Sequence, residues 1–185
     1  MGQEKTIEVE VRSLFDEIKY NELSEFLNAN AEDLGQDDKD TYFFMLPTKV
    51  VKAVHNISRN TAKIVIKLTR VGMGTNDTEE IEIPISPSDF DKSVRLFKEL
   101  SFDQVQRAYQ KRRNYLYKDA ELALKYSESW GYHLEIELMI SDKSEQAEAE
   151  AKLNDIANEL GVKILTPEEQ TAFVNKVDSN YKSNK

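Results

Sequence analysis

Glutamate side chains recur at every second position in two strand-like segments near opposite ends of the strand-rich part of the sequence. Glu8 and Glu10 are followed by Arg12 in the first segment, and Glu135 and Glu137 alternate with aliphatic residues in the second. Alternate residues of a strand point to the same face, so each segment presents a pair of carboxylates on one side. Carboxylate oxygens are ligands of hard divalent cations such as Mg²⁺. These two segments can therefore supply the carboxylates of a metal site.

Basic side chains gather on the segments between these two. Lys63 and Lys67 share one side of their segment, and Arg107, Lys111 and Arg113 share one side of a later one. An ordinary solvent-exposed face mixes acids and bases across neighbouring strands. A sheet closed into a barrel would enclose the charged face. Its acids would then hold a divalent cation and its bases a polyanion such as a triphosphate. The alternative is an open sheet whose charged face lies in water.

The composition limits the chemistry of such a site. The chain has 185 residues, 25 basic and 34 acidic side chains, a net charge of −9 and a mean hydropathy of −0.61. It contains no cysteine and only two histidines, His55 and His133, so any metal should have oxygen ligands. The acidic balance argues against broad nucleic-acid binding, and no apolar run reaches the length of a membrane span. Because no apolar core follows the first residues, as it would in a signal peptide, we expect a cytoplasmic protein.

The elements that position these residues follow from the hydrophobic pattern. Short connections between the strand-like segments predict mainly antiparallel pairing. We expect eight strands, at 5–13, 40–46, 49–57, 61–71, 77–85, 103–117, 120–127 and 131–141. Helices are expected at about 14–30, after the Ser86-Pro87 cap, at 142–160 and at 166–181. The predicted fold is one α+β domain over 1–185, with strands within about 5–141 and C-terminal helices within about 142–182.

Several of these segments resemble the motifs of one known family. The run EVEVR at 8–12 resembles the ExExK signature of the CYTH domain, or triphosphate tunnel metalloenzyme, superfamily. Similar motifs follow in the family's order, in DTYF at 40–43, KIVIKLTR at 63–70, SPSDFDKSVRLFKELSF at 86–102, KRRNY at 111–115 and WGYHLEIE at 130–137. The superfamily includes class IV adenylate cyclases, thiamine triphosphatases and inorganic triphosphatases.

This resemblance implies an eight-stranded antiparallel β-barrel, the triphosphate tunnel, with helices packed outside. It implies Mg²⁺ or Mn²⁺ as cofactor and ATP, thiamine triphosphate or inorganic triphosphate as the small ligand. The implied metal ligands are Glu8, Glu10, Glu135 and Glu137, of which Glu135 and Glu137 are also the implied catalytic residues. The implied phosphate-binding residues are Arg12, Lys52, Lys63, Lys67, Arg107, Lys111 and Arg113. A one-residue slip would bring Arg112 into the tunnel instead of the last three, and we prefer the register that keeps three bases together.

The sequence also departs from the family pattern. Lys125 stands where the resemblance places a metal-binding aspartate, and the segment VVKAVHN at 50–56 lacks a usual pair of arginines. We predict a metal-dependent enzyme that hydrolyses a nucleoside, thiamine or inorganic triphosphate. The alternatives are a class IV adenylate cyclase, which makes cyclic AMP and pyrophosphate from ATP, or a catalytically inert module that binds nucleotide or polyphosphate. The effect of Lys125 and the formation of a homodimer are left open.

Overall fold

The protein has an α+β fold with a large antiparallel sheet. The structure is a computed structural model and describes residues 7–68 and 80–183. In these residues the strands are β1 (Ile7–Phe15), β2 (Glu32–Gln36), β3 (Lys39–Met45), β4 (Val50–Asn56), β5 (Thr61–Lys67), β6 (Glu80–Ile85), β7 (Gln104–Tyr117), β8 (Ala120–Ser127) and β9 (Gly131–Ile140). The α-helices are α1 (Glu17–Asn30), α2 (Phe90–Lys98), α3 (Gln146–Glu159) and α4 (Pro167–Ser183). None of the helices described is long and apolar enough to cross a membrane.

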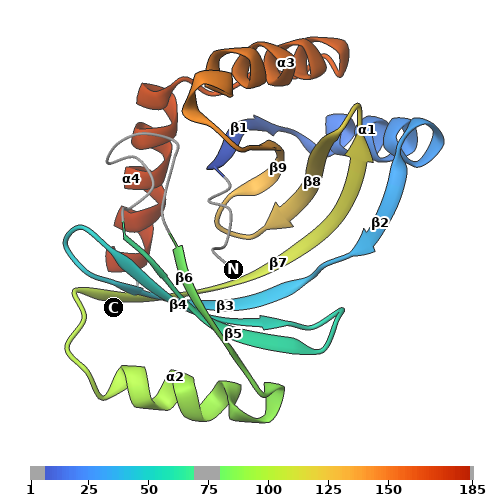
Figure 1. The fold of residues 1–185 in the computed structure, drawn as a ribbon. Helices are drawn as coiled ribbons and strands as arrows, with labels where there is room; N and C mark the ends of the chain where they lie inside the picture. Colours follow the sequence, from blue (N-terminus) through green and yellow to red (C-terminus); the bar gives the residue numbers. More distant parts are fainter. Residues whose placement is uncertain (1–6, 69–79, 184–185) are drawn as a thin grey trace. The chain divides into compact units, whose positions relative to one another are not determined.

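The sheet has the strand order β1-β9-β8-β7-β3-β4-β5-β6, and β2 pairs with one end of β7 (Figure 1). This arrangement confirms the antiparallel α+β prediction and corrects the number of strands, because nine are described and eight were expected. Within residues 7–68 and 80–183 no pairing joins β1 to β6, so the sheet is not closed and the predicted barrel is not confirmed. Parts of the strands expected at 61–71 and 77–85 lie outside the described residues.

The additional strand is β2, in the segment between the helix expected at about 14–30 and the strand expected at 40–46. Its residues are mostly exposed, and the register with β7 shifts between Asp33 and Gly35. Gly35 has a φ of +91°, a backbone conformation that glycine adopts without a steric penalty. A short, polar, irregular edge strand lacks the apolar alternation by which strands are recognised, and this is why the prediction missed it.

Contacts along the backbone divide the chain into two compact units. Unit 1 comprises Met1–Gln36, Arg112–Tyr126 and Trp130–Thr166. In its core, α1 and α3 pack on the aliphatic face of β1, β8 and β9 (Figure 1). The fully buried side chains there include Leu23, Leu27, Leu122, Leu124, Leu134, Ile136, Leu153 and Ile156. Because side chains alternate along a strand, this burial directs the polar residues of the same strands to the opposite face.

Unit 2 comprises Asp37–Lys111, Ser127–Ser129 and Pro167–Lys185. Its core lies between α2 and one face of β3, β4 and β5, and it includes Phe44, Val51, Ala53, Ala62, Phe90 and Val94. Phe90 and Val94 are the buried residues of this helix, and Ser86, the predicted cap residue, caps the 3₁₀ turn that precedes it. Helix α4 is joined to β7, because Gln106 Nε2 donates to Asp178 Oδ1 at 2.8 Å.

Candidate functional site

Three carboxylates converge on the polar face of unit 1. Glu8 and Glu10 come from β1 and Glu137 from β9, and the register pairs Glu10 directly with Glu137. One carboxylate oxygen from each residue lies within 4.8 Å of the others. Val9, between the two glutamates of β1, is buried in the core, so packing of the aliphatic face fixes the direction of the acidic one. This group can supply three oxygen ligands to one divalent cation.

The electrostatics of this group favour a cation. The pKa of Glu137 is raised, first by burial and then by the negative charges of Glu121 and Glu10, although Arg112 and Lys125 oppose the shift. The Glu10 Oε1 atom is buried and accepts no hydrogen bond, while the Arg12 guanidinium lies beside it as an ion-pair partner. Carboxylates that repel one another suit a bound metal ion, whose positive charge relieves the repulsion.

Glu135, the fourth glutamate predicted as a ligand, lies outside this group. Arg12 Nε donates to its Oε1 at 3.0 Å, and Lys125 Nζ forms an ion pair with its Oε2. Lys125 is almost fully buried on β8, with 3% of its surface exposed. The structure therefore brings Glu8, Glu10 and Glu137 together and places Glu135 between two cations.

Trp130 and His133 border this part of unit 1. The Arg12 guanidinium lies 5.9 Å from the centre of the Trp130 ring, and the two aromatic rings are 5.5 Å apart. Burial and the positive charges of Lys125 and Arg12 lower the pKa of His133 to about 3. The imidazole is therefore neutral near pH 7, and its Nδ1 lies 3.0 Å from the Gly131 carbonyl oxygen.

The basic residues predicted on β7 lie on the face opposite to the one expected. Arg107 shares a face with Tyr42 and the core under α2, and it forms a two-pronged ion pair with Asp40, with distances of 3.0 and 2.7 Å. Arg113 lies on the face of the buried Tyr115, where its Nε donates to Asp33 at 3.0 Å.

The face chosen from the sequence to keep Arg107, Lys111 and Arg113 together is thus the one that carries the helices, and the choice is corrected. Arg112 occupies the opposite face, where its Nε donates to Asn114 Oδ1 at 2.6 Å and its Nη2 lies 3.6 Å from Glu121 Oε1. The prediction chose the face of β7 with the larger number of basic residues. That number does not indicate which face packs against the core, so the prediction was wrong.

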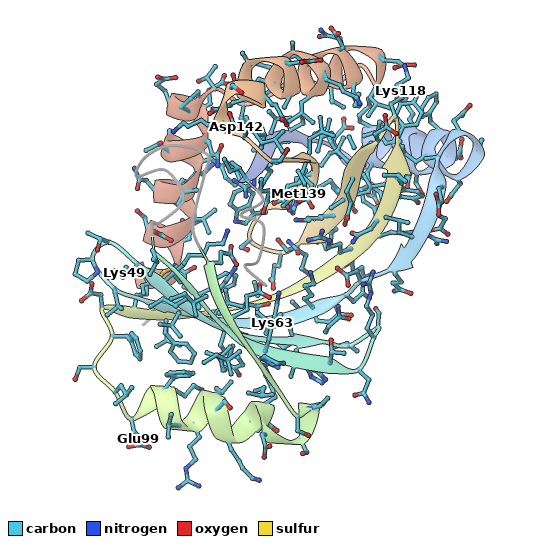
Figure 2. All side chains as sticks on the ribbon, viewed as in Figure 1. Lys49, Lys63, Glu99, Lys118, Met139 and Asp142 are labelled. Atoms are coloured by element: carbon cyan, nitrogen blue, oxygen red, sulfur yellow. The ribbon has the colours of Figure 1, made fainter. Side chains whose placement is uncertain are left out.

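The remaining predicted phosphate-binding residues form a lysine cluster in unit 2, defined by Lys52, Lys63 and Lys67. Lys63 is labelled in Figure 2 on β5. The strand register places all three on the face opposite α2. Glu80 forms ion pairs with Lys52 and Lys67. Lys63 Nζ lies 2.5 Å from Glu82 Oε1.

Burial and the neighbouring Lys67 charge lower the pKa of Lys52 to about 8, although Glu80 opposes the shift. Crowded, partly desolvated lysines are stabilised by an anion. The cluster therefore has the charge and the burial that suit an anion such as a phosphate group.

Sequence reasoning missed one residue of the carboxylate face, Glu121. It alternates with the buried Leu122 and Leu124 on β8 and lies on the same face as Lys125. Asn114 Nδ2 donates to Glu121 Oε1 at 2.8 Å, so β7 and β8 are joined by this side-chain pair. The alternation of Glu121 with two leucines is the signal that would have identified it.

The protein has an antiparallel α+β fold in which three carboxylates from two strands lie close together. This arrangement is typical of proteins that can bind a divalent cation. The model of the CYTH domain matches residues 6–172 of this chain, and the chain belongs to that family. The resemblance inferred from the motifs is thereby confirmed.

Solved structures share the fold. The PH1012 protein of Pyrococcus horikoshii is 22% identical, with a TM-score of 0.70 over 90% of this chain and 98% of its own. A conserved hypothetical protein of Pyrococcus furiosus is 24% identical, with a TM-score of 0.68 over 88% and 99%. A putative adenylyl cyclase of Hippeastrum, described as having a dominant triphosphatase activity, is 16% identical, with a TM-score of 0.62 over 86% and 90%. No curated protein matches this chain by sequence.

Proposed function

We propose that this protein is a metal-dependent enzyme that hydrolyses a nucleoside, thiamine or inorganic triphosphate. The observation that carries the proposal is the convergence of Glu8, Glu10 and Glu137 within 4.8 Å in a chain that belongs to the CYTH domain family. The proposed cofactor is Mg²⁺ or Mn²⁺, because oxygen ligands suit these hard cations. When bound, the metal would neutralise charge on the phosphate oxygens.

The residues of the chain have separate proposed roles. Glu8, Glu10 and Glu137 are the proposed metal ligands, and Glu137 is also the proposed group that orients an attacking water. Lys52, Lys63 and Lys67 are proposed to contact phosphate oxygens, because lysines serve as point charges for phosphate. Arg112 of unit 1 is a separate proposed phosphate contact, because it lies on the same face as Glu121. The closed tunnel, the cytoplasmic location and the absence of nucleic-acid and membrane partners remain parts of the proposal.

Product analysis tests the reaction. Purified protein is incubated with tripolyphosphate, ATP or thiamine triphosphate, each with Mg²⁺, Mn²⁺ or EDTA, and the products are resolved by ion-exchange chromatography. Metal-dependent release of orthophosphate from any of the three supports the proposal. Cyclic AMP with pyrophosphate would establish the cyclase instead, and binding without product would establish an inert module.

A matched pair of variants tests the ligands. The double variant Glu8→Gln/Glu10→Gln should lose metal-dependent turnover by at least about 100-fold, because two of the three ligands lose their charge. Glu148→Gln changes an exposed glutamate of α3 and should leave turnover unchanged. Equal activity in both variants would refute the assignment of the metal ligands.

A further inference from the structure

Lys125 is a buried cation in the middle of the polar face of unit 1. On β8 it follows Leu124, whose side chain is buried in the core, and it shares the opposite face with Glu121. Only 3% of Lys125 is exposed. Taking an ammonium group out of water is costly unless a carboxylate accompanies it. The buried position of Lys125 therefore requires a fixed acidic partner.

That partner is Glu135, and each of its two carboxylate oxygens contacts a different cation. Lys125 Nζ pairs with Oε2, and Arg12 Nε donates to Oε1 at 3.0 Å. One carboxylate is thus shared by two cations, so the triad of Arg12, Lys125 and Glu135 has a net positive charge, and its Arg12 guanidinium also forms an ion pair with Glu10. Its charge opposes the approach of a second metal ion, whereas the group of Glu8, Glu10 and Glu137 attracts the first.

We propose that Lys125 sets the metal stoichiometry of this protein. By holding Glu135 away from metal, it limits the chain to one divalent cation, which is bound by Glu8, Glu10 and Glu137. The inference rests on the proposed metal site and adds to it a residue that determines how many cations bind. Lys125 is a positioning residue in this account, because it acts through Glu135.

The test counts bound metal and requires no turnover. Mn²⁺ binding to the purified chain is measured from the electron paramagnetic resonance signal of free Mn²⁺ and by calorimetry. The native chain should bind one equivalent. Lys125→Met should bind a second equivalent, because Glu135 loses one of its two cations. Lys125→Met/Glu135→Gln should return to one equivalent, because the released carboxylate is absent. Lys118→Met, at an exposed lysine paired with Glu159, is the matched control and should bind one.

Two equivalents on the native chain, or one equivalent on a folded Lys125→Met, would overturn the role of Lys125. No binding by the native chain would overturn the proposed metal site itself, so the two failures are distinct. If Lys125→Met does not fold, Glu135→Gln in the native background keeps the proposal falsifiable. That variant should bind one Mn²⁺ with an affinity within about threefold of the native value. A loss of tenfold or more would show that Glu135 is a ligand and would refute the proposal.

Discussion

Arg112 and Arg113 are neighbours in the chain, but their side chains lie on opposite faces of β7. Arg112 contacts Asn114 and Glu121 on the carboxylate face, and Arg113 contacts Asp33 on the face of the buried Tyr115. Adjacent residues of a strand always diverge in this way. The two residues can therefore be compared directly, because they have the same charge and adjacent positions in the chain but lie on opposite faces of the sheet.

The first prediction uses this comparison. Arg112→Met should weaken binding of tripolyphosphate by at least about tenfold, because a charge-assisted contact to phosphate contributes about 1.5–3 kcal/mol. Arg113→Met should change the affinity by less than about twofold, since its guanidinium lies on the helix-bearing face. Calorimetry with Ca²⁺ in place of Mg²⁺ measures the two dissociation constants. A larger loss of affinity in Arg113→Met than in Arg112→Met would support the register preferred from the sequence, with Arg113 in contact with phosphate.

The second prediction concerns the pH dependence contributed by Lys52. Its folded pKa is about 8 against an ordinary 10.5, so between these values the unfolded chain binds more protons and stability rises with pH. Below pH 8 the charged Lys52 lowers the free energy of unfolding by the full amount that corresponds to this pKa shift, up to about 3 kcal/mol. Lys52→Met should therefore stabilise the fold by about 1–3 kcal/mol at pH 7 and by much less near pH 10.

Urea unfolding at the two pH values measures this difference. Lys92→Met, at an exposed lysine of α2, should leave the free energy of unfolding within about 0.5 kcal/mol at both. The stabilised Lys52→Met should also bind tripolyphosphate more weakly, as expected if the buried charge serves binding. If Lys52→Met is destabilised equally at pH 7 and pH 10, the buried charge of Lys52 does not destabilise the fold and the prediction is wrong.

The third prediction concerns the carboxylate group without metal. The pKa of Glu137 is raised, so the folded chain holds its proton more tightly and stability falls as pH rises through that pKa. The destabilisation is complete only at pH values above the raised pKa of Glu137. Glu137→Gln should therefore raise the melting temperature in EDTA at pH 7.5, and it should abolish the further stabilisation that Mn²⁺ gives the native chain. A lower melting temperature in EDTA would show that Glu137 stabilises the metal-free fold.

The fourth prediction concerns the attachment of α4 to β7 within unit 2. Gln104 Nε2 donates to the Asp178 carbonyl oxygen at 3.2 Å, and Gln106 Nε2 donates to its carboxylate. Both glutamines are buried, so loss of the carboxylate leaves a buried donor without this acceptor. Asp178→Ala should cost about 1–3 kcal/mol in urea unfolding. Glu148→Ala on α3 should cost less than about 0.5 kcal/mol, and equal losses would contradict the role of the α4 contact.

Local patterns predicted most of the elements and the members of the carboxylate group. Alternation identified the strands that bear Glu8, Glu10 and Glu137, because one face of each strand is apolar and buried. The Ser86-Pro87 cap identified the start of the segment that forms α2. Strand β2 escaped prediction because its residues are polar and exposed, and no local signal distinguishes such a strand from a loop.

The partners of the charged residues followed no local rule. Arg12 and Glu135 are 123 positions apart in the chain and meet because β1 pairs with β9. Lys125 and Glu135 are only 10 positions apart, yet their ion pair depends on which faces β8 and β9 share. Pairing register and packing of the core determine both contacts.

The sequence by itself determined the period of each strand, the kinds of charge available and the motifs of the CYTH family, since these depend only on residue types and spacing. The tertiary structure decided which charges face one another. It united Glu8, Glu10 and Glu137 and placed Glu135 between Arg12 and Lys125. It also placed Arg107 and Arg113 on the helix-bearing face. The physical reason is that burial of apolar surface selects the face that the helices cover, and the polar side chains take the directions that remain.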